Sequence, residues 1–155
     1  MICQKPPVAD LTILRAAGTL VILETAKGAR PAVLYAGPDM EGAAPSSLAL
    51  LQTSQHIPGG PQHPIQPSLL NPLGSGWPGA PGLAAHRGGT DWAIDLRVSK
   101  AEQISDYQID VHCADAEANI AATHHFALCP STGVLGCSVS LSNMAELPIE
   151  LRHCA

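Results

Sequence analysis

Apolar and polar side chains alternate over several short runs of this chain, and the first runs lie near its start. Leu11–Arg15 and Thr19–Thr25 are aliphatic and β-branched, and three small residues, Ala16–Gly18, separate them. Two such runs around a short turn predict a pair of strands joined in a hairpin. Pro31–Tyr35 follows the polar turn Lys27–Arg30 as a third candidate. The beginning of the chain is therefore predicted to be a three-stranded meander.

Alternation returns after Thr90. Every second residue from Trp92 to Val98 is apolar, while Asp95 and Arg97 fall on the other face of an extended chain. Further strands, with turns between them, are predicted at Ile104–Cys113, Ala118–Cys129, Val134–Asn143 and Leu147–His153. Two of these strands have one consistent face, which carries Tyr107, Ile109, Val111 and Cys113 in the first and Leu135, Cys137, Val139 and Leu141 in the second. The pattern predicts consecutive antiparallel hairpins.

Between these regions, from about Gly37 to Gly89, proline and glycine interrupt every period. The prolines are too closely spaced for a regular element, and they are Pro58, Pro61, Pro64, Pro67, Pro72, Pro78 and Pro81. Within this stretch Ser46–Thr53 is predicted as one helical turn or a short strand. The loop Gly42–Gly82 has two interpretations, a disordered linker or an ordered loop that a sandwich projects toward a partner or ligand.

Composition narrows the possible functions. The chain has 155 residues, 46% of them hydrophobic but only 3% aromatic, so one domain with an aliphatic core is expected. Its formal net charge is -5, which provides no basic surface for nucleic acid. The sequence from Met1 to Arg15 lacks the features of a secretory signal, and no apolar run has the roughly 20 residues that span a bilayer. We expect a cytosolic protein with neither a nucleic-acid nor a membrane partner.

The cysteines indicate the same compartment. Their number is odd and no two form a C-x-x-C pair; they are Cys3, Cys113, Cys129, Cys137 and Cys154. This argues against a disulfide framework and against a zinc knuckle. We interpret them as small buried apolar residues in a reducing compartment.

Several features taken in order resemble the N-terminal domain of glycoside hydrolase family 36 α-galactosidases. They are the glycine turn Gly74 and Gly76, the segment Pro81–Leu83, the hairpin His86–Gly89, the strand Val139–Asn143 that ends in asparagine, and the opening strands with Tyr35 and Gly37. The resemblance covers most of the chain, and the order of the features carries more weight than any one of them.

The resemblance implies an all-β fold, an antiparallel β-sandwich of the large supersandwich type, for residues 1–155. In complete family members this domain packs against a catalytic (β/α)8 barrel, which is absent here. The last predicted strand runs to Ala155 without a following turn, so the domain is expected to be incomplete at its C-terminus. The family's two catalytic aspartates lie on the barrel and hydrolyse terminal α-galactosides with retention. We therefore expect no catalytic residue, cofactor or metal ion in this chain.

The resemblance also provides one candidate contact with substrate. Many family members carry an acidic residue and an arginine after the glycine turn, whereas this chain has Trp77 and Pro78. The indole of Trp77 is a candidate to line the galactose pocket, because an indole ring stacks on the apolar face of a sugar. The alternative is that Trp77 packs beneath its own loop, given the large area that an indole buries.

Other groups of polar residues have weaker functional interpretations. His124, His125 and Cys129 suggest zinc, but neighbouring residues of a strand point to opposite faces. His56 and His63 are expected to be solvated. Asp106, Asp110, Asp115 and Glu117 suggest paired catalytic carboxylates, but a solvated sheet face explains them as well. The serines Ser46, Ser47, Ser138 and Ser140 occupy no G-x-S-x-G motif, so nucleophilic catalysis is not predicted.

Three functions remain in view. The leading hypothesis is the non-catalytic N-terminal portion of an α-galactosidase, which supports the barrel and the contacts between subunits. Its partners are the barrel and, through the complete enzyme, the α-galactoside. The alternatives are a free-standing carbohydrate-binding sandwich, which needs an exposed aromatic platform, and a structural module for homo-oligomerisation, suggested by the unpaired final strand.

Overall fold

The computed structural model describes residues 11–41 and 68–155. Within these ranges the chain forms β-strands, one short 3-10 turn and no α-helix. The elements are β1 (Leu11–Ala16), β2 (Thr19–Glu24), β3 (Ala32–Pro38), η3 (Leu73–Ser75), β4 (Leu83–His86), β5 (Arg97–Ser105), β6 (Gln108–Asp115), β7 (Ile120–Leu128), β8 (Leu135–Asn143) and β9 (Glu150–Cys154). No helix in the described part of the chain is long and apolar enough to cross a membrane. The predicted element at Ser46–Thr53 lies outside the described residues.

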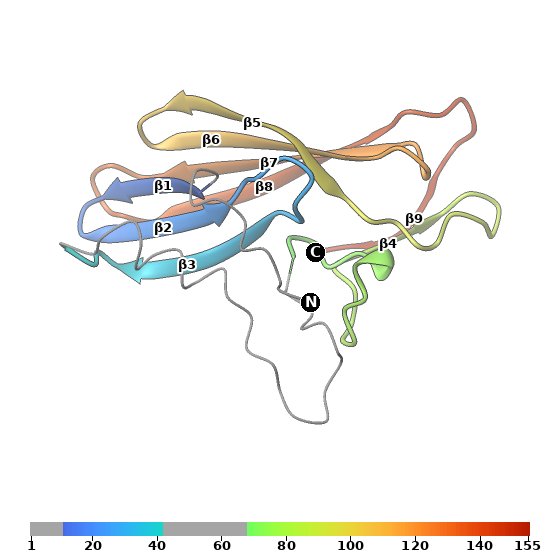
Figure 1. Ribbon diagram of the computed structural model, residues 1–155, viewed down its shortest axis with the longest axis horizontal. Helices are drawn as coiled ribbons and strands as arrows, with labels where there is room; N and C mark the ends of the chain where they lie inside the picture. Colours follow the sequence, from blue (N-terminus) through green and yellow to red (C-terminus); the bar gives the residue numbers. More distant parts are fainter. Residues whose placement is uncertain (1–10, 42–67) are drawn as a thin grey trace, which may run out of the picture.

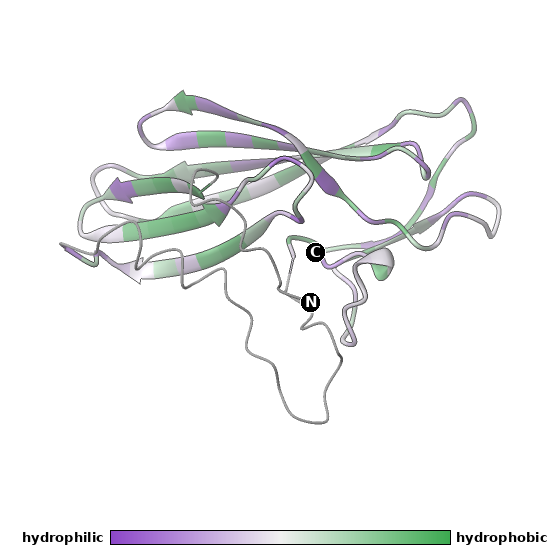
Figure 2. Cartoon of the chain, viewed as in Figure 1, coloured by the Kyte–Doolittle hydropathy of each residue, from purple (hydrophilic) through white to green (hydrophobic). Residues whose placement is uncertain are grey.

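The strands form antiparallel sheets that pack together (Figure 1). One sheet has the order β1-β2-β3, a second has the order β5-β6-β7-β8, and β4 pairs with β9 in a small third sheet. Between the sheets lies one apolar cluster with members from all three, among them Val21 of β2, Ala85 of β4 and Phe126 of β7. Figure 2 shows the apolar residues recurring along these strands. The predicted all-β antiparallel sandwich is confirmed.

The first hairpin forms for the reason that its sequence suggests. Ala16 pairs with Thr19, so Ala17 and Gly18 alone make the turn, with φ values of 46° and 75°. Two residues of positive φ give the turn whose twist matches that of the strands it joins. The turn therefore fixes the register that buries Leu14 and Val21 in the core.

One predicted strand was wrong because it contains a turn. The chain reverses at Asp106 and Tyr107, so the predicted strand Ile104–Cys113 belongs partly to β5 and partly to β6. The hydroxyl oxygen of Ser105 accepts a hydrogen bond from the Tyr107 amide, a local contact that stabilises turns. The predicted apolar face is confirmed for Ile109, which is buried, but Tyr107 lies in the turn and is 38% exposed.

A second correction concerns the stretch that proline and glycine were expected to keep irregular. β4 lies inside it and pairs with β9, with Leu83 opposite Cys154 and His86 opposite Glu150. The predicted strand Leu147–His153 is accordingly shifted, because β9 spans Glu150–Cys154. Pairing with a distant strand thus orders four residues whose own sequence carries no strand signal.

The segment before β5 also departs from the prediction. Ile94, Leu96 and Val98 are buried on one face, as expected, but β5 begins only at Arg97. Trp92 does not share the buried face and is 43% exposed. The amide of Asp95 bonds the carboxylate of Asp115 at 2.8 Å, so the backbone here is held by a side chain instead of a neighbouring strand.

Candidate functional site

A tight hairpin follows β4 and forms the centre of the candidate site. Arg87 and Thr90 exchange two backbone hydrogen bonds of 2.9 and 2.8 Å. Between them Gly88 and Gly89 have φ values of 53° and 88°, the conformation that a two-residue hairpin turn requires. The next residue, Asp91, also has a positive φ, 60°, which is uncommon for a residue with a side chain. The hairpin thereby presents Arg87 and Asp91 side by side.

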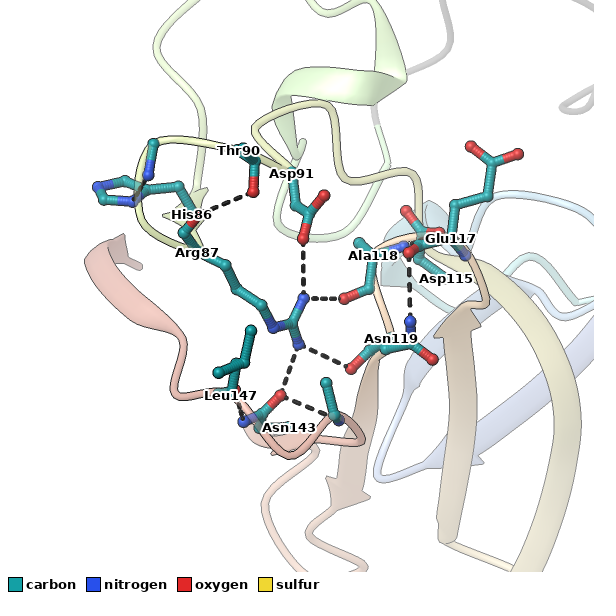
Figure 3. Close-up of polar contacts among 12 residues, drawn as sticks. His86, Arg87, Thr90, Asp91, Asp115, Glu117, Ala118, Asn119, Asn143 and Leu147 are labelled. Carbon is teal, nitrogen blue, oxygen red and sulfur yellow. Dashed lines mark hydrogen bonds and ion pairs between the residues drawn. The ribbon is translucent and has the colours of Figure 1, made fainter.

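Arg87 is a buried hub that joins three parts of the chain (Figure 3). Its side chain is only 8% exposed and contacts Asp91 at 3.2 Å within the hairpin. It also donates to the carbonyl oxygens of Ala118 and Asn119 in the β6–β7 turn, the second at 3.1 Å. A fourth bond, of 2.5 Å, reaches Oδ1 of Asn143 at the end of β8. Charged donors and a planar fork make such contacts strong and directional.

The β6–β7 turn has its own anchor, Asp115. One oxygen of its carboxylate accepts hydrogen bonds from the amides of Glu117 and Ala118, at 2.9 and 3.0 Å. The other oxygen holds the amide of Asp95, as described above. Asp115, a candidate for a catalytic carboxylate, thus has both of its oxygens engaged in fixing backbone.

Next to the hub lies an open cleft of about 360 Å³, lined by Asp91, Trp92, Ala93, Asp115, Glu117 and Ala118. The indole of Trp92 is fixed at its edge, because its Nε1 donates to the carbonyl oxygen of Gly89 at 3.0 Å. Its ring also contacts the imidazole of His86, with 4.2 Å between ring centroids. The cleft therefore combines an immobilised, partly exposed indole with carboxylates.

The glycine turn that contains Trp77 packs against the segment before β5. The amide of Gly74 donates to the carbonyl oxygen of Ile94 at 2.8 Å. A Cβ atom on Gly74 would lie far inside van der Waals contact with the carbonyl oxygens of Ala93 and Ile94. Gly76 has a φ of 77° and ends the 3-10 turn. The two positions require glycine for different reasons. At Gly74 the backbone of another segment lies too close for a side chain, and at Gly76 the backbone is left-handed.

Arg30 reinforces this turn. Its guanidinium makes a two-point contact with Asp95, at 2.8 and 3.1 Å, and reaches the carbonyl oxygen of Gly74 at 3.3 Å. Arg97 contacts the same carboxylate at 2.5 Å. Burial opposes ionisation of Asp95, but the hydrogen bonds from the two arginines outweigh it and lower the pKa of this group below its usual value.

Trp77, the predicted substrate contact, lies at the end of this turn. Its side chain is half-buried, and its indole lies directly over Gly79, where a Cβ atom would meet Nε1. Trp77 thus contacts its own loop on one side. Its contact with a sugar remains a prediction.

The adjacent histidines divide between the two faces of β7, as expected. His124 is buried, and its Nε2 has no hydrogen-bond partner. His125 lies on the outer face and contacts Asp110 across the sheet at 2.9 Å. Within residues 11–41 and 68–155, no cluster of three or more histidine, cysteine, aspartate or glutamate side chains could hold a metal ion. His56 and His63 lie outside the described residues.

Two further expectations need correction. Asp106 and Asp110 do not share one face of a strand, because Asp106 lies in the β5–β6 turn. Of the cysteines only Cys113 is buried; Cys137 and Cys154 are exposed, and Cys3 lies outside the described residues. Cys129 is partly exposed, and hydrogen bonds from Ser131 and Thr132 lower the pKa of its thiol to about 6.

Arg87 is a site residue that the sequence does not reveal. The run from His86 to Gly89 resembles a hairpin of the family, but an arginine beside two glycines gives no sign of burial. Its partner Asn119 lies in a turn and its partner Asn143 lies next to one, and asparagine is common at such positions for local reasons. Only the fold brings these residues together.

Comparison with protein families finds one match, to the glycosyl hydrolase family 36 N-terminal domain, over residues 29–155. The match includes the glycine turn, the Arg87 hairpin and the cleft. Comparison with the curated proteins finds no match.

Several solved structures share the fold. The GH36 alpha-galactosidase AgaB from Geobacillus stearothermophilus is 13% identical, with a TM-score of 0.73 over 99% of this chain and 24% of that one. The galactosidase domain of the alpha-galactosidase-sucrose kinase AgaSK is 14% identical, with a TM-score of 0.75 over 94% and 24% of the two chains. The alpha-galactosidase from Lactobacillus brevis is 13% identical, with a TM-score of 0.74 over 93% and 23%. This chain therefore spans about a quarter of the length of the structures it matches.

Proposed function

The chain belongs to glycosyl hydrolase family 36, to that family's N-terminal domain, and from this membership we propose that it is the non-catalytic portion of an α-galactosidase. The complete enzyme hydrolyses terminal α-galactosides with retention, using two carboxylates on a separate barrel domain. The observation that carries the proposal is the family match over residues 29–155. The share of the solved structures that the chain covers supports the presence of further domains in the complete enzyme.

The role we propose is to support the barrel and the contacts between subunits. Three carboxylates in or near the cleft favour this role, because each of them holds part of the fold in place. Asp95 is paired with two arginines, Asp91 contacts Arg87, and Asp115 holds backbone amides. Groups engaged in this way fix the positions of turns. The rigid turns at this end of the sandwich are suited to position a neighbouring domain.

The test compares the chain alone with a longer protein that includes the barrel. We expect the isolated chain, shown to be folded by circular dichroism, to leave p-nitrophenyl α-galactoside intact, and the longer protein to hydrolyse it. Turnover by the isolated chain, or a gene that encodes no barrel with paired aspartates next to this domain, would contradict the proposal.

Trp77 is proposed as a contact to the galactoside in the complete enzyme. Its half-buried indole lies at the tip of the glycine turn that Arg30 and Ile94 hold in place. Replacing Trp77 with alanine in the complete enzyme is expected to raise KM for the α-galactoside about tenfold or more while kcat changes little. An unchanged KM would leave Trp77 as packing for its own loop.

One observation favours carbohydrate binding by the domain itself as a second candidate function. This function needs an exposed aromatic platform, and Trp92 is 43% exposed in a cleft with Asp91 and Glu117. Both tryptophans of the chain report on fluorescence, so titration with galactose and melibiose should be run on the Trp92→Ala and Trp77→Ala variants. A saturable change that only Trp92→Ala abolishes supports binding in the cleft. If the fluorescence of the unmodified chain does not change on addition of sugar, this candidate function is excluded.

We also propose a cytosolic location and assembly of the complete enzyme as a homo-oligomer. Four free thiols in the described part of the chain support the reducing compartment. The mass of the complete enzyme in solution, measured by light scattering, tests the assembly, and a monomer would contradict it.

A further inference from the structure

The outer face of the β5–β8 sheet carries a row of polar side chains that do not line the cleft. Three of them, Asp110 of β6, His125 of β7 and Ser140 of β8, come from consecutive neighbouring strands. Asp110 Oδ1 lies 2.9 Å from His125 Nδ1, and Ser140 Oγ lies 3.1 Å from His125 Nε2. A hydroxyl, an imidazole and a carboxylate are thus connected in series by two hydrogen bonds.

Strand register produces this series. Asp110 is directly opposite His125, whereas Ser140 is opposite Thr123 and so lies diagonally from His125. Diagonal neighbours on one face of an antiparallel sheet are within reach of a long side chain. The inward residues of the same strands, Val111 and His124, are buried in the core, and they therefore fix which face the three polar groups occupy.

The two hydrogen bonds also fix the chemical roles. A carboxylate can only accept, so the proton of a neutral imidazole lies on Nδ1, where it bonds Asp110. Nε2 is then the free base, and it accepts the hydroxyl proton of Ser140. This is the arrangement in which a histidine activates a serine and a carboxylate holds the histidine in the correct tautomer. The sequence alone did not reveal it, because the three residues occupy no motif.

We propose that Ser140 is a nucleophile activated by His125 and that the pair hydrolyses small activated esters. This activity is separate from the proposed glycosidase function, since it breaks an acyl bond and needs no barrel. Ser140 is exposed on the sheet face, which gives a small ester with a good leaving group access to its hydroxyl. The half-exposed His125 is accessible to solvent and to the ester.

The reaction proceeds in two balanced steps. Ser140 Oγ attacks the acyl carbon while its proton passes to Nε2 of His125. The bond to the leaving oxygen then breaks, the imidazolium gives its proton to that oxygen, and an acyl-serine and a neutral His125 remain. Water then attacks the acyl carbon with His125 as base, and the carboxylic acid leaves as Ser140 recovers its proton.

The experiment follows p-nitrophenolate release from p-nitrophenyl acetate by the isolated chain. Cys129, Cys137 and Cys154 must first be changed to alanine, because their partly or fully exposed thiols would react with the same ester. In this background we expect a rate that rises linearly with ester concentration. Ser140→Ala and His125→Ala should each reduce the rate at least about tenfold. Ser140→Cys should retain acyl transfer, because it retains a nucleophile.

Ser138 and Ser142 provide matched controls. Both lie on β8 with Ser140 and are exposed on the same face, and Ser138 is directly opposite His125. Alanine at either position should leave the rate unchanged. After rapid acid quenching, peptide mass spectrometry should find the acetyl group on Ser140. A rate that survives Ser140→Ala, or acetyl on another residue, would overturn the proposal.

Asp110 is a positioning residue, and its test needs a signal that stability alone does not change. The imidazole 15N shifts of His125 should report the Nδ1–H tautomer in the unmodified chain and a mixture of tautomers in Asp110→Ala. The ester rate should fall in the same variant. Unchanged 15N shifts would show that Asp110 does not hold the tautomer.

Discussion

At Gly74 the backbone leaves no room for a side chain, whereas at Gly76 it leaves room but has an unusual conformation. Gly74→Ala must displace the carbonyl oxygens of Ala93 and Ile94, so we expect a loss of stability on the order of 3 kcal/mol. Gly76→Ala meets no atom within contact distance and has only the strain of a φ of 77°, about 1 kcal/mol. Urea denaturation of the two variants measures the difference in the free energy of unfolding. Equal losses of stability would contradict the different roles assigned to Gly74 and Gly76.

His124 makes the stability of the fold depend on pH. Burial, with a smaller contribution from the charge of His125, lowers its pKa from 6.5 to about 4. Above pH 6.5 the imidazole is neutral in both the folded and the unfolded chain, and it contributes no pH dependence. Between pH 6.5 and about 4 the unfolded chain binds a proton at His124 that the folded chain does not bind. The free energy of unfolding therefore decreases as the pH is lowered, by up to about 3 kcal/mol.

Urea denaturation at pH 7 and pH 5 tests this dependence. His124→Leu should show a smaller loss on acidification than the unmodified chain, because leucine binds no proton in the folded or the unfolded chain. His153 is exposed on β9 and provides the control: His153→Ala should keep the full loss. A His124→Leu variant with an unchanged acid loss would show that other groups cause it.

At the scale of elements, Arg87 connects the hairpin after β4 with the β6–β7 turn and with the end of β8. Lysine retains the charge but cannot reach four acceptors at once. Arg87→Lys is therefore expected to cost about 3 kcal/mol and to speed amide exchange in the hairpin and in the β6–β7 turn. Arg15→Lys is the control, since its single contact with Asp39 is partly exposed and of little energetic value. Exchange that changes equally in both variants would contradict the role of a hub.

Elements that depend on local signals were predictable, and those that depend on distant partners were not. The β1–β2 hairpin has a period of two around a glycine turn, so both strands and the turn followed from sequence. The β5–β6 turn at Asp106 and Tyr107 lacks glycine and proline, and the surrounding alternation continues through it. β4 exists because β9 pairs with it, and a single sequence without further information does not specify such pairings.

The candidate sites follow the same division. The glycine turn could be predicted from the sequence, because the backbone at both positions requires glycine. The Arg87 hub and the Asp110–His125–Ser140 series were not visible, because each joins residues from three elements. His124 and His125 could be assigned to opposite faces in advance, since the strand period alone decides it.

At the scale of the whole molecule, one apolar cluster draws on every sheet of the described chain. It includes Val21 of β2, Leu83 of β4, and Val111 and Phe126 of the four-stranded sheet. If one of these sheets separated from the others, the apolar cluster that they share would be exposed to water. We therefore expect the isolated chain to unfold in one cooperative transition.

Three probes should then give the same midpoint in urea: far-ultraviolet circular dichroism for the strands, tryptophan fluorescence for the cleft and the glycine turn, and alkylation of Cys113 for the core. Cys113 is 1% exposed, and burial raises the pKa of its thiol to about 12, so it reacts only after unfolding. Phe126→Ala should lower stability by about 3–5 kcal/mol and shift the three curves together. Ile104→Ala, which removes an exposed side chain, should leave them in place. A tryptophan transition that precedes the other two would show that the cleft end unfolds as a separate unit, and the rigid platform proposed for the barrel would then be excluded.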